Sequence, residues 1–128
     1  MKLLSLKEQE SYLCSKIGQP VNFKYPKGEQ GKSGKLEDRL VVFDREDESV
    51  VYWNLIDLIE FKGEKERWLR ITYYRYKKDG KWVFAGQTSI ADPMTSFVDL
   101  FVAAIKNKTW VRKLFKEVFN KCEYELKS

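Results

Sequence analysis

The chain has 128 residues, of which 43% are hydrophobic and 15% aromatic, and its net charge is +5. This size and composition predict a single domain, residues 1–128, with a packed core, and argue against intrinsic disorder. Histidine is absent, which excludes Ser-His and Cys-His nucleophiles, histidine general bases and histidine-ligated metals. The longest apolar run, residues 97–105, is interrupted by Asp99, so we expect no insertion into a membrane.

Charge is unevenly spread along the chain. Residues 36–61 carry a net charge of −6, and residues 62–90 carry +5. A basic surface attracts nucleic acid, anionic lipid or an acidic protein, although a lysine-rich surface with local ion pairs has the same composition. Cys14 and Cys122 lie near opposite ends of the chain. Without an export signal after Met1, we expect both to be reduced, buried thiols in a cytoplasmic protein.

The first predicted element is a helix over residues 5–17. Ser5 and Glu8 have the spacing of a capping box, and Gly18 is a natural helix terminator. The apolar residues of this segment form only a narrow stripe, so we expect the helix to lie on the surface of another element.

The next part of the chain, residues 20–90, has the alternating and β-branched pattern of an antiparallel sheet. Its predicted strands cover residues 21–25, 35–44, 50–61, 68–77 and 82–88. A glycine-rich loop, residues 26–34, follows the first strand, and Asn54 marks a place where the third can bend or divide. Asp79 and Gly80 are the strongest hairpin signal, because this pair suits the two-residue turns between antiparallel strands.

Two helices are predicted at the end of the chain, over residues 93–106 and 110–122. Asp92 is the expected N-cap of the first, with Pro93 at the first helical position, and Thr109 is the expected N-cap of the second. The fold class is therefore predicted as α+β. It comprises a small bent antiparallel sheet or barrel of about five to seven strands, an N-terminal helix and two C-terminal helices.

Two sequence patterns are similar to catalytic motifs. Gly31-Lys32-Ser33 is similar to the end of a phosphate-binding loop, but that motif needs an earlier glycine where this chain has Pro26, and a helix where a strand is predicted. A glycine-rich connection between strands is the better interpretation. The acidic turn near Glu46 lacks the spacing of a calcium loop.

The second pattern is Glu60-x-Lys62, with Asp38, Asp44 or Asp57 upstream. In nucleases that resemble restriction endonucleases, two carboxylates hold a divalent metal and a lysine stabilises charge on the scissile phosphate. Such a triplet also arises by chance in a highly charged chain, and a hairpin is predicted where that fold needs a helix. A metal-dependent nuclease is therefore a remote alternative, and we predict no catalytic residue, no metal site and no cofactor.

The predicted hairpin gives the candidate ligand-binding residues. A two-residue loop at Asp79-Gly80 places Tyr76 opposite Val83 and Tyr74 opposite Ala85. One face then carries Leu69, Ile71, Tyr73, Trp82 and Phe84, which we expect to face the core. The other face carries the candidates Trp68, Arg70, Tyr74, Tyr76 and Lys78. Aromatic and cationic side chains interleaved on a sheet can stack bases or hold a peptide, and coverage of this face by the terminal helices is the alternative.

The order of elements resembles a pleckstrin-homology-like domain over residues 20–107. The resemblance lies in the segments Leu40-Val41-Val42-Phe43, Leu55-Ile56-Asp57-Leu58-Ile59-Glu60 and Trp68-Leu69-Arg70-Ile71-Thr72, followed by residues 82–88 and the helix from Pro93. It implies an antiparallel barrel of two bent sheets closed by a C-terminal helix, and it matches no functional motif. The glycine-bearing loop that leads into Lys35-Leu36 also resembles a feature of Sm-like small barrels.

These features predict a non-catalytic binding or assembly module. Large aromatic residues exceed what so small a domain can fully bury, so we expect a protein or peptide partner, or a homo-oligomer. The alternative is a nucleic-acid-binding protein that uses the basic and aromatic hairpin.

Overall fold

A computed structural model describes residues 2–23, 32–84 and 93–127 and confirms the α+β class. The elements are α1 (Leu6–Cys14), β1 (Pro20–Phe23), β2 (Lys32–Asp47), β3 (Val50–Phe61), β4 (Trp68–Lys77), β5 (Trp82–Phe84), α2 (Met94–Asn107) and α3 (Thr109–Leu126). They form two compact units, Met1–Ile90 with α1 and the sheet, and Ala91–Ser128 with α2 and α3.

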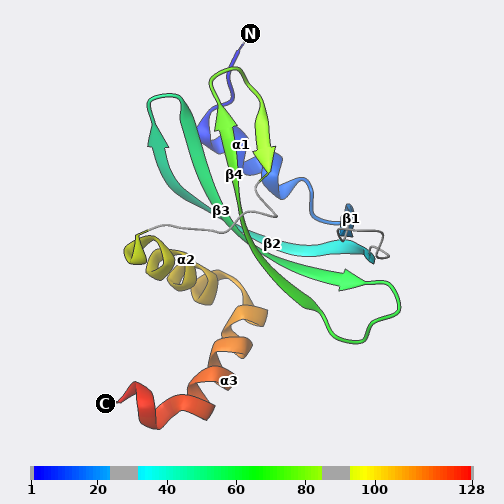
Figure 1. The fold of residues 1–128 in the computed structure, drawn as a ribbon, viewed down its shortest axis with the longest axis vertical. Helices are drawn as coiled ribbons and strands as arrows, with labels where there is room; N and C mark the ends of the chain where they lie inside the picture. The colour runs from blue at the N-terminus through cyan, green and yellow to red at the C-terminus, as the bar shows by residue number, and fades with distance from the viewer. Residues whose placement is uncertain (1, 24–31, 85–92, 128) are drawn as a thin grey trace, which may run out of the picture. The chain divides into compact units, whose positions relative to one another are not determined.

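The described strands form one open antiparallel sheet in the order β1-β2-β3-β4-β5, so each strand pairs with its neighbours in the chain (Figure 1). The pairing of β2 with β3 shifts register between Leu36 and Asp38, and again between Phe43 and Arg45. An extra residue in one strand of a pair bends that strand and increases its twist. These two irregularities account for the bent sheet that the sequence predicts.

Two of the predicted strands have the expected bounds, β1 begins one residue early, β2 differs at both ends, and β5 begins as predicted. Segments 50–61 and 68–77 are β3 and β4, and Asn54 is buried within β3 without dividing it. β2 begins three residues before the predicted position and ends three after it, because it pairs with β3 over nearly the whole length of that strand. The predicted ends of the first and last strands, residues 24–25 and 85–88, and the predicted loop residues 26–31 lie outside the described residues.

The prediction of a two-residue hairpin loop at Asp79-Gly80 is wrong. The Lys77 N–H donates to the Lys81 carbonyl at 3.0 Å, and the Gly80 N–H donates to the Lys77 carbonyl at 2.9 Å. The loop therefore contains three residues, 78–80. Gly80 has a φ of 81°, the left-handed conformation that ends three-residue hairpin loops.

The longer loop moves the register of β5 by one residue. Tyr76 pairs with Trp82 and Tyr74 pairs with Phe84, where the shorter loop predicted Val83 and Ala85. Because successive side chains in a strand point to opposite faces, this shift turns every side chain of β5 to the other side of the sheet. Trp82 and Phe84 thus share the face of the candidate binding residues instead of the opposite face.

Helix α1 begins as predicted and ends early. Ser5 and Glu8 form the expected capping box, in which each side chain accepts a hydrogen bond from the other residue's backbone N–H. The helix ends at Cys14 rather than at residue 17. Gly18 has a φ of 91°, and its N–H donates to the Leu36 carbonyl. The glycine therefore starts the pairing with β2 instead of ending the helix.

A hydrophobic core of the first unit lies between α1 and the sheet. Its buried hydrophobic residues are Leu13, Val51, Trp53, Leu55 and Tyr76. Trp53 Nε1 donates to Gln9 Oε1 at 2.8 Å, Gln9 Nε2 donates to the Leu4 carbonyl, and the Leu4 N–H donates to the Tyr76 hydroxyl. These bonds satisfy buried polar groups at the contact between α1 and the sheet, so α1 covers the Tyr76 end of the candidate face.

Gly34 allows the close approach of β2 and β3. A methyl group on Gly34 would lie 2.5 Å from the Glu60 carbonyl oxygen and 2.9 Å from Phe61 Cδ1. Since backbone cannot yield as a flexible side chain does, we expect Gly34→Ala to lower the free energy of unfolding by about 1–3 kcal/mol. Urea denaturation measures this loss, and the exposed neighbour Lys35→Ala, expected to change it by less than about 0.5 kcal/mol, is the control. Equal stability of both variants would contradict the close contact.

The caps of α2 and α3 differ from the prediction. Pro93 occupies the N-cap position of α2 and gives no side-chain cap, while Asp92 lies outside the described residues. Thr109 is the first residue of α3, and Lys108 holds its N-cap position.

Helix α3 extends four residues past its predicted end at Cys122. Cys122 itself has non-helical backbone angles (φ −122°, ψ 16°), so the helix is kinked there. Its thiol is exposed and not buried as predicted. None of the described helices is long and apolar enough to cross a membrane.

Candidate functional site

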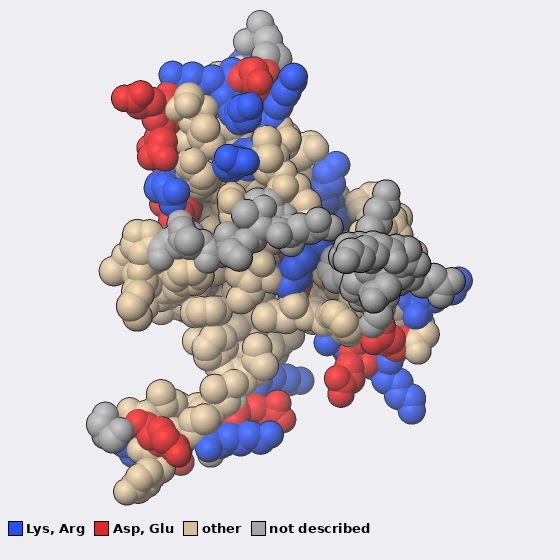
Figure 2. Space-filling view, in the orientation of Figure 1, with Lys and Arg blue, Asp and Glu red and all other residues tan. Residues whose placement is uncertain are grey.

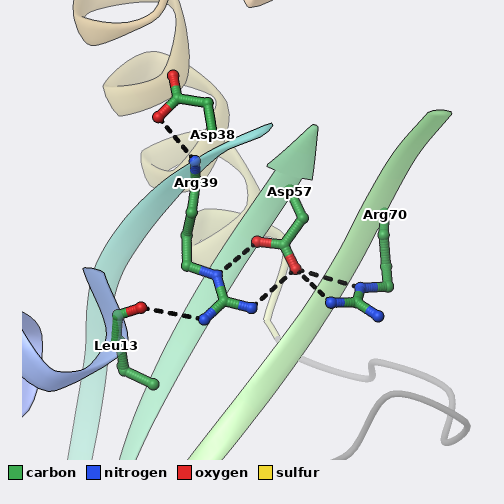
Figure 3. Close-up of polar contacts among 5 residues, drawn as sticks. All are labelled: Leu13, Asp38, Arg39, Asp57 and Arg70. Carbon is green, nitrogen blue, oxygen red and sulfur yellow. Dashed lines mark hydrogen bonds and ion pairs between the residues drawn. The ribbon is translucent and has the colours of Figure 1, made fainter. Parts of the chain in front are cut away.

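Three charged side chains meet on one face of the central strands. In the strand registers Arg39 of β2 lies opposite Asp57 of β3, and Asp57 lies opposite Arg70 of β4. Directly opposed residues of antiparallel strands share a face. Arg39 donates from Nε and Nη2 to both Asp57 oxygens at 2.7 and 3.1 Å, and Arg70 donates from Nε and Nη2 to Asp57 Oδ2 at 3.1 and 2.8 Å (Figure 3).

This cluster, Arg39–Asp57–Arg70, is largely withdrawn from solvent. The side chains of Asp57, Arg39 and Arg70 are 0%, 2% and 16% exposed. Burial by itself lowers the pKa of Arg39, but hydrogen bonds and the charge of Asp57 outweigh it and raise this pKa above its ordinary value. Arg39 is therefore a permanent cation, and Asp57 has the charged partners that a buried carboxylate requires.

The cluster also joins the sheet to the end of α1. Arg39 Nη1 donates to the carbonyl of Leu13 at 3.1 Å (Figure 3). The last carbonyls of a helix lack partners within the helix and favour a nearby cation. Helix α1 has no basic residue in its last turn, so Arg39 supplies that cation from the neighbouring strand.

A pocket of about 260 Å³ lies beside the cluster. Its lining residues come from the turn after α1, the segment leading into β1, and β1, β2, β4 and β5: Lys16, Gln19, Pro20, Val21, Asn22, Leu36, Arg39, Arg70, Tyr74 and Phe84. Tyr74 and Phe84 form an aromatic wall, with ring centroids 4.9 Å apart. The Arg39 guanidinium lies 5.5 Å from the Tyr74 centroid, and that of Arg70 lies 5.2 Å from the Phe84 centroid, within the range of cation–π attraction.

The charges around the pocket favour an anion. Lys16, Arg39 and Arg70 line it, and no carboxylate is among its described lining residues. Asp57 beneath them supplies one negative charge. Even if that charge is assigned entirely to Arg70, the charges of Arg39 and Lys16 remain, and a partly enclosed site strengthens their field. The pocket is smaller than most sites for whole small molecules, so it suits a single anionic group.

The structure brings together two of the five candidate residues predicted from the sequence. Arg70 and Tyr74 both line the pocket. Trp68 lies beyond it, with its ring edge-on to Phe61 at 5.1 Å, and Tyr76 is buried under α1.

The fifth candidate, Lys78, also lies away from the pocket. It is exposed in the β4–β5 loop, where its N–H donates to the Ser49 carbonyl. The five residues therefore do not form one continuous binding face.

Sequence reasoning missed three charged or aromatic residues that line the pocket, Lys16, Arg39 and Phe84. Arg39 lies in a strand otherwise notable for its apolar run, and Lys16 lies in the turn after α1, so neither belongs to the hairpin pattern. Phe84 was assigned to the opposite face because of the loop length. A search for opposite charges on adjacent predicted strands could have suggested the pairing of Asp57 with arginine, but only if the register was known.

The metal-site pattern is not assembled. Asp57 and Glu60 are three residues apart in β3 and so point to opposite faces, and both Asp57 oxygens accept hydrogen bonds from arginine. No group of three potential ligands gathers among the residues that the structure describes. Lys32 and Ser33 of the phosphate-loop pattern begin strand β2, not a helix.

Figure 2 shows both positive and negative side chains among the described residues on the visible face of the first unit. No protein-family model matches the chain, and the searches of curated proteins and of solved structures give no significant match. The resemblance to pleckstrin-homology-like domains therefore stays a prediction, and the pocket must be interpreted from its own chemistry.

Proposed function

We propose that the chain is a non-catalytic binding module whose pocket takes one anionic group carried by a protein or peptide partner. The observation that supports this most strongly is a small pocket that combines an aromatic wall with three cations, whose charge the single carboxylate of Asp57 balances only in part. Guanidinium groups donate paired hydrogen bonds to carboxylate and phosphate oxygens. The cationic groups lining the pocket, Lys16, Arg39 and Arg70, can bind and orient an anion but cannot accept a proton from one.

The size of the pocket and its position favour a partner larger than the anion. Val21 belongs to β1 and Phe84 to β5, the two edge strands of the sheet. Edge strands have backbone groups that can pair with an extended segment of another chain. A peptide with an acidic side chain or terminus in the pocket could therefore continue along either edge.

A titration followed by nuclear magnetic resonance tests this proposal. The full chain, labelled with ¹⁵N, is titrated with acetate, with inorganic phosphate and with a peptide of alternating glutamate and leucine. We expect the side-chain Nε–H signals of Arg39 and Arg70 to shift with each probe, and most with the peptide. The proposal fails if none of the three probes moves these signals.

A charge-matched pair of variants locates the binding site. Lys16→Gln removes a cation that lines the pocket, and we expect it to weaken peptide binding about fivefold, the effect of one partly exposed ionic contact. Lys62→Gln makes the same change in net charge at an exposed residue outside the pocket lining, so its affinity should equal that of the parent. Equal weakening by both variants would indicate general charge attraction and not this pocket.

Titration with single-stranded and double-stranded oligonucleotides addresses the alternative function. Binding that falls steeply with salt and is lost in Arg70→Ala or Tyr74→Ala would favour a nucleic-acid-binding protein instead.

A further inference from the structure

The second unit has an apolar groove that is separate from the pocket. The groove has a volume of about 450 Å³ and is lined by Ile105, Arg112, Phe115, Lys116, Val118, Phe119, Asn120 and Leu126. Three of its apolar side chains are substantially exposed, with Phe119 at 47%. The charged residues that line it, Arg112 and Lys116, are both basic.

The groove arises because only the first half of α3 is held against α2. The rings of Phe101 and Phe115 lie 5.3 Å apart, and Arg112 donates to the carbonyls of Ile105 and Lys106 at 2.9 and 3.2 Å. Beyond Phe115 the apolar side of α3 continues through Val118, Phe119 and Leu126 but remains exposed. An apolar helix face in contact with water is the usual mark of an interaction surface.

Charge is distributed unevenly along the same helix. Residues 108–116 contain four basic and no acidic residues, whereas residues 117–127 contain three acidic and two basic residues. An occupant of the groove must therefore supply apolar side chains and negative charge beside Lys116. The second half of α3 carries both.

We propose that the groove binds α3 of a second copy of this chain, with the two helices antiparallel around a two-fold axis near Phe119. Each copy then contributes one groove, and its own α3 occupies the groove of the other copy, as a two-fold interface requires. Residues equally distant from Phe119 on either side oppose each other, which places Lys116 beside residues 122 and 123 of the second copy. These residues lie at the kink of α3, and Glu123 pairs with Lys127 of its own chain at 2.9 Å. Lys116 of one copy therefore competes with Lys127 for Glu123 of the other.

The orientation follows from the charges. A parallel pair would place four basic residues against the same four, which is destabilising. The antiparallel pair places Arg112, Lys113 and Lys116 against residues 122–126, which include Glu123 and Glu125, and also opposes the two helix dipoles. The occupant is therefore an antiparallel copy, and an unrelated acidic helix is an alternative that the experiment tests.

Sedimentation equilibrium of the full chain over a range of concentrations tests the dimer. We expect a reversible monomer–dimer equilibrium whose Kd rises at least about a hundredfold in Phe119→Glu, because two carboxylates would replace apolar contacts at the axis. Met94→Glu makes the same kind of substitution at an 84% exposed position on α2 and should leave the Kd unchanged. A parent chain that is monomeric at every concentration overturns the proposal, as does an unchanged Kd in Phe119→Glu.

Charge reversal tests the antiparallel arrangement, because a second substitution can restore dimerisation that was lost to charge repulsion but not dimerisation that was lost to misfolding. Lys116→Glu and Glu123→Lys should each raise the dimer Kd about fivefold, and the double variant should return it to within about twofold of the parent. Loss without recovery in the double variant would mean that these residues do not meet across the axis, and the arrangement would be wrong.

Discussion

Asp57→Asn is expected to lower the free energy of unfolding by about 3–5 kcal/mol, which is the effect of leaving buried charges without their partner. The substitution leaves Arg39 and Arg70, at 2% and 16% side-chain exposure, without the carboxylate that both contact. An amide of the same shape offers one acceptor and no charge in its place. Thermal and urea denaturation measure the loss, and the melting temperature should fall by about 10 °C or more.

A matched control separates this effect from the removal of any acid. Asp47→Asn changes an aspartate that is 58% exposed and lies 3.7 Å from Arg45, so we expect a change of less than about 1 kcal/mol. If Asp47→Asn and Asp57→Asn lower the free energy of unfolding equally, the buried cluster does not stabilise the fold more than an exposed ion pair does.

The cluster can also be replaced as a whole. A variant with Asp57→Leu, Arg39→Met and Arg70→Met substitutes apolar side chains for all three charges, and buried ionic triads often tolerate this exchange without net loss. We expect this variant to recover most of the stability lost in Asp57→Asn but to bind none of the anionic probes. That combination would show that the charges are retained for binding. Continued anion binding by the apolar variant would place the anion site elsewhere.

Trp53 is expected to show the largest effect of a single core substitution. It is 3% exposed and packs in the hydrophobic core with Leu13, Leu55 and Tyr76. Trp53→Ala should lower the free energy of unfolding by about 3–5 kcal/mol, because it removes a large buried ring and leaves a cavity. Trp53→Phe keeps much of the ring but removes the hydrogen bond to Gln9 Oε1, and should cost about 1–3 kcal/mol.

Trp68→Phe is the control for the hydrogen bond of Trp53. Trp68 is 38% exposed, and its Nε1 donates to Glu64 at 3.2 Å, so water can replace that partner and the loss should be under about 1 kcal/mol. Hydrogen exchange adds a local measure, because Trp53→Phe should speed exchange of α1 amides more than those of β3. Equal losses in the two phenylalanine variants would show that the buried bond to Gln9 does not hold α1 on the sheet.

The sequence alone determined those elements whose signals are local. The capping box of Ser5 and Glu8 places the start of α1 correctly, and β-branched or alternating runs place β3 and β4 within their observed bounds. Hydrogen bonds between neighbouring residues and the two-residue side-chain period need no knowledge of distant parts of the chain. The fold class follows from the order of these elements.

Only the tertiary structure decided the site. One additional residue in the β4–β5 loop turns Phe84 to the face of Tyr74, and turn signals in the sequence do not specify loop length to that accuracy. Arg39 and Asp57 are 18 residues apart in the chain, and their ion pair exists because β2 and β3 align in one register. A pocket built from the turn after α1, the edge strands and the centre of the sheet depends on such long-range pairings, which no local pattern of residues encodes.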